Sequence, residues 1–184
     1  VDDCSTGRSW EVIQKWASID SRIRAFRNKT NLGDYPNRNC AAAYAQGKYL
    51  KYVDSDDLLL HGRLGIFVRA MEKHPTASYA ITAERTQLLS PREIAIRVIF
   101  DFKRAIGGAP GNLIILTEAF RDIGGFASFP GTGDYELQCN LAEKSPILLV
   151  ESDFIHSRIV DENQSHQHIR SIQTKTRVQQ LTLT

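Results

Sequence analysis

Segments with helical periodicity alternate with strand-sized apolar segments along this chain of 184 residues. Leu64, Phe67, Val68 and Met71 repeat at the spacing of a buried helix face, and Ile147–Val150 is an apolar run of strand length. This alternation predicts an α/β fold in which helices cover a mostly parallel sheet. Ligands of such sheets bind beyond the carboxyl ends of the strands, so polar residues at these ends are candidates for function.

The periodicity confines each expected element to a short range. The first helix should begin at Ser9, whose hydroxyl can cap it. Its buried face should consist of Trp10, Ile13, Trp16 and Ala17. The segment 92–102 fits a helix or a strand, and we favour the helix. The other expected helices are 36–45, 64–71, 117–123 and 135–144, and the expected strands are 23–27, 49–53, 77–83, 112–116 and 147–150.

The composition excludes several classes of protein. Net charge is +2 and no basic run of five or more residues occurs, so the signature of a nucleic-acid binder is missing. No apolar stretch approaches the roughly 18–20 residues that a membrane span requires. Cys4, Cys40 and Cys139 lie far apart, which provides no structural zinc site. We expect a reduced, cytoplasmic protein, with the inner face of the membrane as an alternative location.

Acidic residues gather at three places where an α/β sheet binds ligands. They are Asp2-Asp3 before a helix, Asp54-Ser55-Asp56-Asp57 after a strand, and Asp134 at the start of a helix. Asp2, Asp3 and Asp134 could equally be helix caps. Three carboxylates within four residues repel one another unless a cation or donor groups offset the charge. Hard cations such as Mg²⁺ and Mn²⁺ prefer these ligands and share them with substrate phosphates, so we favour a metal bridged to a diphosphate.

The order of the motifs resembles inverting family 2 glycosyltransferases, which have the GT-A fold, a three-layer, Rossmann-like α/β fold. The family pattern runs from Asp-Asp-Gly-Ser through Asn-x-Gly, Arg-Asn, Ala-x-Gly, Asp-Ser-Asp-Asp and Gly-Gly-Phe to an acidic motif with the catalytic base. The matching segments are Asp2–Ser5, Asn31–Gly33, Arg38-Asn39, Ala45–Gly47, Asp54–Asp57, Gly124–Phe126 and Gly133–Glu136.

The resemblance implies a role for each matched residue. Asp3 would accept a hydrogen bond from the nucleotide base, and Asp54 would lie near the ribose. Asp134 would be the general base that deprotonates the acceptor hydroxyl; its position at a helix N-terminus should keep its pKa low. The implied nucleotide-sugar-binding residues are Asp3, Ser5, Arg38, Asn39, Asp54 and Ser55, and the implied ligands of Mn²⁺ or Mg²⁺ are Asp56 and Asp57.

The implied activity is metal-dependent, inverting transfer of a sugar from a nucleotide-diphospho-sugar, a UDP-sugar first, to a saccharide or lipid-linked saccharide. The chain should form one catalytic domain over 1–184. Its parts would be a nucleotide-binding part (1–60), an acceptor-side part (61–160) and a C-terminal tail (161–184). The family's opening strand and helix would precede Val1, which indicates a chain truncated at its N-terminus. A family Arg-x-His would align with Arg158-Ile159-Val160, where the histidine is missing.

Two alternatives stay open at this level, as does the oligomeric state. A nucleotidyltransferase that makes sugar nucleotides would need a glycine-rich, basic phosphate loop near the N-terminus, which is not visible in this sequence. A non-catalytic nucleotide-binding domain is favoured by the missing first strand and disfavoured by the presence of Asp56 and Asp134. For Asp134, the competing interpretation is a plain helix N-cap.

Overall fold

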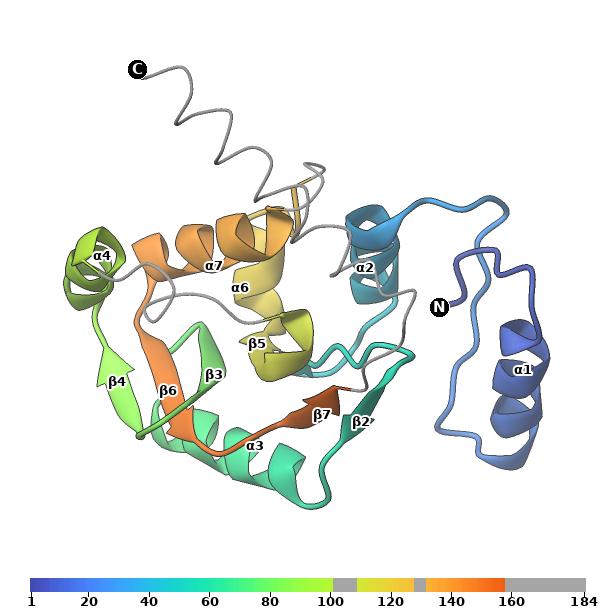
Figure 1. Ribbon diagram of the computed structural model, residues 1–184, viewed down its shortest axis with the longest axis horizontal. Helices are drawn as coiled ribbons and strands as arrows, with labels where there is room; N and C mark the ends of the chain where they lie inside the picture. Colours follow the sequence, from blue (N-terminus) through green and yellow to red (C-terminus); the bar gives the residue numbers. More distant parts are fainter. Residues whose placement is uncertain (101–108, 128–131, 158–184) are drawn as a thin grey trace, which may run out of the picture.

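The structure, a computed structural model, describes residues 1–100, 109–127 and 132–157 (Figure 1). Its α-helices are α1 (Ser9–Ile19), α2 (Asp34–Ala43), α3 (Arg63–Lys73), α4 (Pro91–Phe100), α6 (Thr117–Asp122) and α7 (Gly133–Lys144), and Pro110–Asn112 forms a 3-10 turn. Its strands are β1 (Tyr49–Leu50), β2 (Asp57–Leu59), β3 (Tyr79–Ala83), β4 (Gln87–Leu89), β5 (Leu113–Leu116), β6 (Ile147–Glu151) and β7 (Ile155–Ser157).

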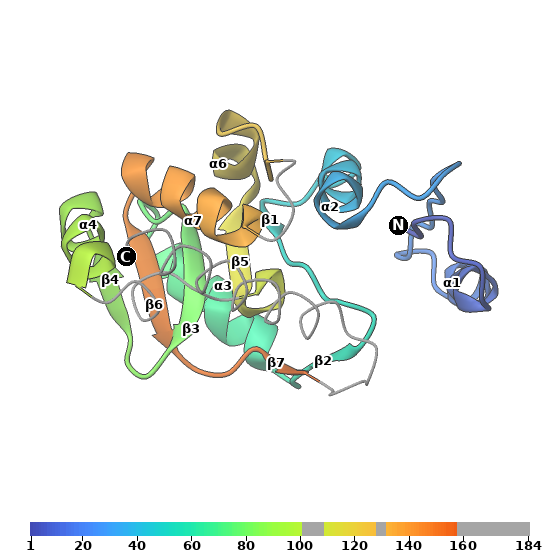
Figure 2. The same cartoon turned by 45° about the horizontal axis from the view of Figure 1, so that its top comes forward.

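The elements form three layers around a five-stranded sheet with the order β1-β5-β3-β6-β4. Helix α3 lies on one face of this sheet, and α4, α6 and α7 lie on the other (Figures 1 and 2). A second, two-stranded sheet pairs β2 with β7 in antiparallel register, with Leu58 opposite His156. The three-layer α/β fold predicted from the sequence is confirmed.

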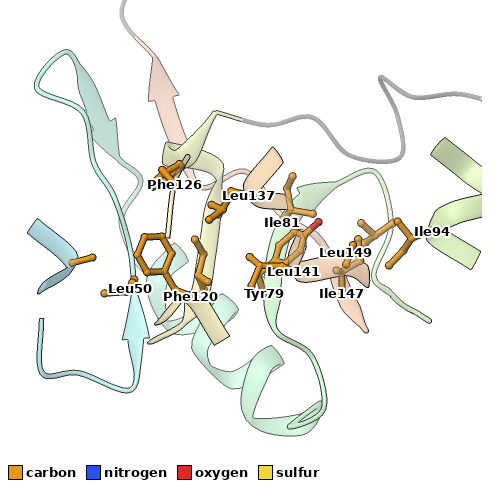
Figure 3. Close-up of a cluster of buried hydrophobic side chains, with 14 of the residues drawn as sticks. Leu50, Tyr79, Ile81, Ile94, Phe120, Phe126, Leu137, Leu141, Ile147 and Leu149 are labelled. Atoms are coloured by element: carbon orange, nitrogen blue, oxygen red, sulfur yellow. The ribbon is translucent and has the colours of Figure 1, made fainter. Parts of the chain in front are cut away.

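Side chains of the central strands alternate between two hydrophobic clusters. Tyr79 and Ile81 face the cluster under α7, whereas Ala80, between them, faces the cluster under α3. The strands β5 and β6 repeat this alternation, as expected for the two-residue period of a strand. The inward residues of α7, Leu137 and Leu141, complete the first cluster (Figure 3). Both faces of the sheet are therefore covered by buried, mostly apolar side chains.

The central sheet is mixed, where the sequence predicts a mostly parallel one. Only β3 and β6 pair in parallel among the strands that the structure describes; the pairs β1–β5, β3–β5 and β4–β6 are antiparallel. Three residues, Glu84–Thr86, separate β3 from β4. A parallel return needs a crossover of a dozen or more residues, so β4 has to run in the opposite direction.

Most of the predicted elements are confirmed, including a helix at 91–100, and three details differ. The segment 23–27 forms only an isolated bridge between Arg27 and Asp2. The predicted strand 49–53 ends at Leu50, and the short strands β2, β4 and β7 were not expected. Three-residue strands give too few alternating positions for a periodic pattern to stand out. Residues 101–102 and the tail 161–184 lie outside the described residues.

Helix α1 differs from its prediction in its cap and in its burial. Arg8 occupies the N-cap position without a side-chain cap, so Ser9 is the first helical residue. None of its residues is buried, and Trp16 is 54% exposed. Figures 1 and 2 show α1 at the edge of the molecule, apart from the central sheet. The apolar stripe identifies a helix, but burial also requires a packing partner.

The stacked pair of Phe67 and Phe154 provides a test of the core under α3. Both rings are fully buried, with centroids 3.9 Å apart. Phe67→Ala should lower the free energy of unfolding by about 3–5 kcal/mol, because it leaves a cavity as well as losing apolar contact. Leu64→Ala on the same helix, where Leu64 is 40% exposed, should cost about 1 kcal/mol or less. Equal losses in urea unfolding of the two variants would contradict this packing.

Candidate functional site

Arg38 joins helix α2 to the acidic loop that follows β1. Its Nη1 and Nη2 donate to the two carboxylate oxygens of Asp54 at 2.8 and 3.1 Å. Its Nε donates to Asp34, one helical turn earlier, at 2.6 Å. Only 14% of the Arg38 side chain is exposed. Burial by itself would lower the pKa of the guanidinium, but the bonds and charges of Asp54 and Asp34 raise it above its ordinary value, so Arg38 remains a fixed cation.

The loop 54–57 is held between this ion pair and the small sheet. The amide of Asp57 donates to the carbonyl of Asp54 at 3.0 Å, which closes a turn. Asp57 then begins β2, opposite Ser157 of β7. Ser55 is exposed, whereas Asp56 is partly buried. The structure thus brings together three of the predicted residues, Arg38, Asp54 and Asp57, at the loop that joins β1 to the two-stranded sheet.

Lys51 is a residue of this region that the sequence analysis missed. Its Nζ donates to the carbonyls of Tyr52, at 2.6 Å, and Gly111, and lies 4.2 Å from the ring centroid of Phe154. Burial lowers the pKa of Lys51 to about 8, against the opposing charges of Asp54 and Asp57. A lysine inside an otherwise apolar segment, three residues before an acidic run, was the signal available in the sequence.

Asp134 lies at the start of α7 and faces residues of α2. It is the second residue of the helix, and Thr132 occupies the N-cap position without a side-chain cap. The interpretation of Asp134 as a plain N-cap is therefore wrong. The Tyr35 hydroxyl lowers the pKa of its carboxyl group. One carboxylate oxygen, Oδ1, is buried without a hydrogen-bond partner in the described part of the chain.

The pKa of Asp134 is raised to about 6, where the sequence predicts a low value. Burial is the main cause, because it disfavours the charged carboxylate. The hydrogen bond from Tyr35 and the charge of Arg38 lower the pKa, while the charges of Asp34 and Asp54 raise it. Desolvation thus outweighs the helix N-terminus, whose effect on an acid is modest.

Gly133 allows Tyr35 to approach Asp134. A Cβ at position 133 would lie 2.7 Å from Cε2 and Cζ of the tyrosine ring. The glycine at this position therefore permits a close contact between α7 and α2.

Asp3 organises the loop that leads into α2. Its Oδ1 accepts hydrogen bonds from Asn28 Nδ2 at 2.7 Å and the amide of Leu32 at 2.9 Å. Its Oδ2 accepts one from the amide of Gly33 at 2.9 Å. Burial would raise the pKa of Asp3, but these bonds outweigh it and lower the pKa. Neither Asp2 nor Asp3 caps α1, whose N-cap is Arg8.

Ser5 lies beside Asp2 through its backbone. The Ser5 amide donates to Asp2 Oδ2 at 3.2 Å, and its carbonyl accepts from Arg27 at 2.8 Å. Arg27 also forms an ion pair with the buried Asp2 at 3.1 Å. The structure therefore gives the backbone of Ser5 a place in this turn, at some remove in the chain from the loop 54–57.

Asn39 holds the Gly-Gly-Phe turn. Its Nδ2 donates to the carbonyl of Phe126 at 2.8 Å, and its Oδ1 accepts from the amide of Phe126 at 2.9 Å. Gly125, with a φ of 80°, fits beneath this amide, because a Cβ there would lie 2.5 Å from Asn39 Oδ1. Asn39 thus connects two sequence motifs that lie 87 residues apart.

The carboxylates of the loop 54–57 are too few to hold a metal ion without further ligands. No group of three or more His, Cys, Asp or Glu side chains within the described ranges is arranged to hold an ion. Both oxygens of Asp54 are engaged by Arg38, so the ligands that the resemblance implies are the other two carboxylates of the loop, Asp56 and Asp57. Mg²⁺ is commonly bound through one or two carboxylates plus substrate phosphates, so a metal held by these two would need the diphosphate as a further ligand.

Comparison with known proteins points to glycosyltransferases. The family model described as glycosyl transferase family 2 matches residues 1–129. The Escherichia coli UDP-Glc:alpha-D-GlcNAc-diphosphoundecaprenol beta-1,3-glucosyltransferase WfaP is 37% identical over 71 residues, which cover 39% of this chain and 28% of that protein. The chain thus spans only part of the length of such relatives.

Solved structures give the same fold. S. aureus TarS in complex with UDP-GlcNAc superposes with a TM-score of 0.70 at 16% identity, over 88% of this chain and 49% of that chain. The mannosyltransferase PcManGT from Pyrobaculum calidifontis, in complex with GDP-Man and Mn²⁺, gives a TM-score of 0.59 at 18% identity, over 83% of this chain and 44% of that chain. The predicted GT-A fold is confirmed. None of the helices in the described part of the chain has the length and apolar character to span a bilayer.

The raised pKa of Asp134 predicts a pH-dependent contribution to stability. Because the folded chain binds this proton more tightly than the unfolded chain, the stabilisation is complete below the ordinary pKa of 3.8 and is lost as the pH rises through about 6. Wild type should therefore lose on the order of 2 kcal/mol relative to Asp134→Asn between pH values of about 4 and 7.

Urea unfolding of both proteins at the two pH values measures this difference. Asp122→Asn, at an exposed aspartate, is the control and should follow wild type. A pH dependence of Asp134→Asn that is parallel to that of wild type would contradict the assignment.

Proposed function

We propose a specific reaction for this chain from one premise: it belongs to glycosyl transferase family 2. It is accordingly a glycosyltransferase, and its donor is a nucleotide sugar. Within that class we propose that the donor is a UDP-sugar, that a divalent metal ion assists, and that an acceptor hydroxyl displaces the nucleotide with inversion at the anomeric carbon.

The observation that carries the proposal is the environment of Asp134. A general base works best when its pKa lies near the working pH, and burial raises the pKa of Asp134 to about 6. Its Oδ1 is buried and has no hydrogen-bond partner within the described residues, so a lone pair is available for an acceptor hydroxyl. The charges of Arg38 and Asp54 act on the same carboxylate, which supports a position of Asp134 near the proposed donor site.

A UDP-sugar is the donor that the relatives favour. WfaP is named for UDP-Glc, and TarS was crystallised with UDP-GlcNAc. We propose that Asp3 contacts the nucleotide base through the hydrogen-bond acceptor site that its contacts within the protein leave unused. An ionised carboxylate offers about four acceptor sites. Asn28, Leu32 and Gly33 use three of them, so Oδ2 can accept one further N–H.

The diphosphate would lie at the loop 54–57. We propose that Asp56 and Asp57 hold Mn²⁺ or Mg²⁺ together with the phosphates, and that Asp54 and Ser55 lie near the ribose. The ion, when bound, offsets the negative charge that develops on the leaving diphosphate. Arg38 keeps Asp54 in place and supplies a permanent positive charge at the same end of the sheet. The described contacts of Ser5 and Asn39 are with other residues of the protein, so these two residues would support the donor site indirectly.

Asp134 then takes the proton of the acceptor hydroxyl as the oxygen attacks the anomeric carbon. The bond from sugar to diphosphate breaks as the new glycosidic bond forms on the opposite face, which inverts the configuration. We propose a saccharide or lipid-linked saccharide as acceptor, because the name of WfaP gives its acceptor as a diphosphoundecaprenol-linked sugar. This acceptor would place the protein in the cytoplasm, at the inner face of the membrane.

Asp134→Asn tests the base directly. Turnover of a UDP-sugar should fall roughly 10²–10⁴-fold, because the amide cannot take the proton, while donor affinity stays near that of wild type. Glu136→Gln, on the same turn of α7, is the matched control and should keep most of the activity. The measurements are UDP release with Mn²⁺ present and calorimetry with UDP. Wild-type turnover in Asp134→Asn would refute the assignment.

Asp56→Ala tests the metal site. The variant should lose the increase in UDP affinity that Mn²⁺ gives the wild-type protein, because the diphosphate no longer has a shared ion. Affinity without metal should change little. Asp153→Ala, at an exposed aspartate, is the control and should retain the effect of Mn²⁺. A Mn²⁺-dependent affinity in Asp56→Ala equal to that of wild type, measured by calorimetry, would exclude Asp56 as a ligand.

A further inference from the structure

We propose that Lys51 is a positioning residue of the acidic loop: its amine holds the backbone of Gly111 beside the carboxylate of Asp57, and this contact fixes the orientation of that carboxylate. The part that concerns a metal rests on the function proposed above, in which Asp57 is a ligand of Mn²⁺ or Mg²⁺. The contacts of Lys51 and Gly111 themselves do not depend on it.

The amine of Lys51 is surrounded by protein groups, and the side chain is partly buried. Its Nζ donates to the carbonyl of Tyr52 at 2.6 Å and to that of Gly111, which lies 60 residues further along the chain. It also lies 4.2 Å from the ring centroid of Phe154, a fully buried residue. A polar group that leaves water needs hydrogen-bond partners, so these two carbonyls determine where the amine lies. Lys51 therefore links the segment after β1 to a distant turn of the chain.

That turn contacts the carboxylate of Asp57. Gly111 is buried in the 3-10 turn Pro110–Asn112, just before β5. A Cβ at position 111 would lie 2.9 Å from Asp57 Oδ2 and 2.6 Å from Ile155 Cδ1. The space beside the Gly111 backbone is therefore too small for even a methyl group. Since Lys51 donates to the carbonyl of this same glycine, the amine and the carboxylate are connected through one backbone residue.

The connection joins the two sheets of the protein. Lys51 directly follows β1, and Gly111 precedes β5, which pairs with β1 in the central sheet. Asp57 begins β2, and Ile155, which also flanks Gly111, begins β7; these two strands form the small sheet. A shift of Gly111 would thus change the position of the central sheet's edge relative to the carboxylate of Asp57. Lys51 opposes such a shift by holding the glycine carbonyl.

The charge of Lys51 and its hydrogen bond should have opposite effects on a bound metal ion. The charges of Asp54 and Asp57 act on the amine, so its positive charge opposes the attraction of these carboxylates for a cation. Removal of that charge alone should strengthen metal binding. Loss of a group that orients a metal ligand weakens metal binding instead, by about 10–100-fold. The sign of the change therefore separates a positioning role from a plain electrostatic one.

Lys51→Met removes the amine and keeps an unbranched side chain of similar length. Calorimetry with UDP, with and without Mn²⁺, measures the increase in UDP affinity that the ion gives. This increase should fall on the order of tenfold in Lys51→Met. Gly111→Ala changes no charge and should reduce the same increase, because its Cβ displaces the Asp57 carboxylate. An increase that is unchanged or larger in Lys51→Met would overturn the inference.

Lys48→Met is the matched control. It removes the same charge from the same segment of the chain, but the amine of Lys48 pairs with Glu72 at the surface, at 2.7 Å. This variant should keep the wild-type increase in UDP affinity with Mn²⁺. A loss equal to that of Lys51→Met would contradict a specific role of Lys51.

Carbon NMR of the full chain, without nucleotide or metal, tests the contact independently of the function. The carbonyl carbon of Gly111 should shift upfield in Lys51→Met, because it loses a hydrogen-bond donor, and should keep its wild-type position in Lys48→Met. A Gly111 signal that is identical in Lys51→Met and wild type would overturn the inference. A shifted signal in a protein whose wild type binds no UDP, with or without Mn²⁺, would refute the proposed function and support the contact of Lys51 with Gly111.

Discussion

The central sheet is apolar on both faces. One face buries Tyr79, Ile115 and Ile147, and the other buries Ala80, Ile114 and Leu148. Burial on both faces leaves no room in the sheet for unpaired charge, because an isolated ion in an apolar interior is very costly. The carboxylates of the candidate site are consequently found in a loop (Asp54), at the start of a strand (Asp57) and at the start of a helix (Asp134). The fold thereby determines where a polar ligand can bind before any ligand contact is considered.

The ion pair between Arg38 and Asp54 holds helix α2 and the acidic loop 54–57 together. It connects α2 to the loop after β1 through two hydrogen bonds, and most of the Arg38 side chain is shielded from solvent. Desolvation offsets much of the attraction in such a pair, so its contribution to stability is small. Its clearer effect is geometric: it sets how far the acidic loop lies from α2, and α2 also carries Tyr35, whose ring packs against the start of α7.

The candidate site was only partly predictable from residue identity. The order of acidic motifs located Asp54, Asp56 and Asp134, because carboxylates at strand and helix ends are visible as such in a sequence. The roles of Asn39 and Lys51 were not visible, since their partners are Phe126, 87 residues away from Asn39, and Gly111, 60 residues away from Lys51. The expected low pKa of Asp134 was wrong for the same reason: a helix start can be recognised locally, whereas burial depends on which helix packs against it.

The sequence by itself determined the kinds of elements and most of their ranges, since a two-residue or 3.6-residue period is a property of neighbouring residues. It also determined the family, through motifs whose order survives in the chain. Only the tertiary structure decided the mixed strand directions, the exposure of α1 and the contact of Tyr35 with the start of α7. Periodicity defines which face of an element is apolar, but it does not name the partner that covers that face. Pairing, burial and pKa are set by groups that are distant along the chain, and so they emerge only when the elements pack together.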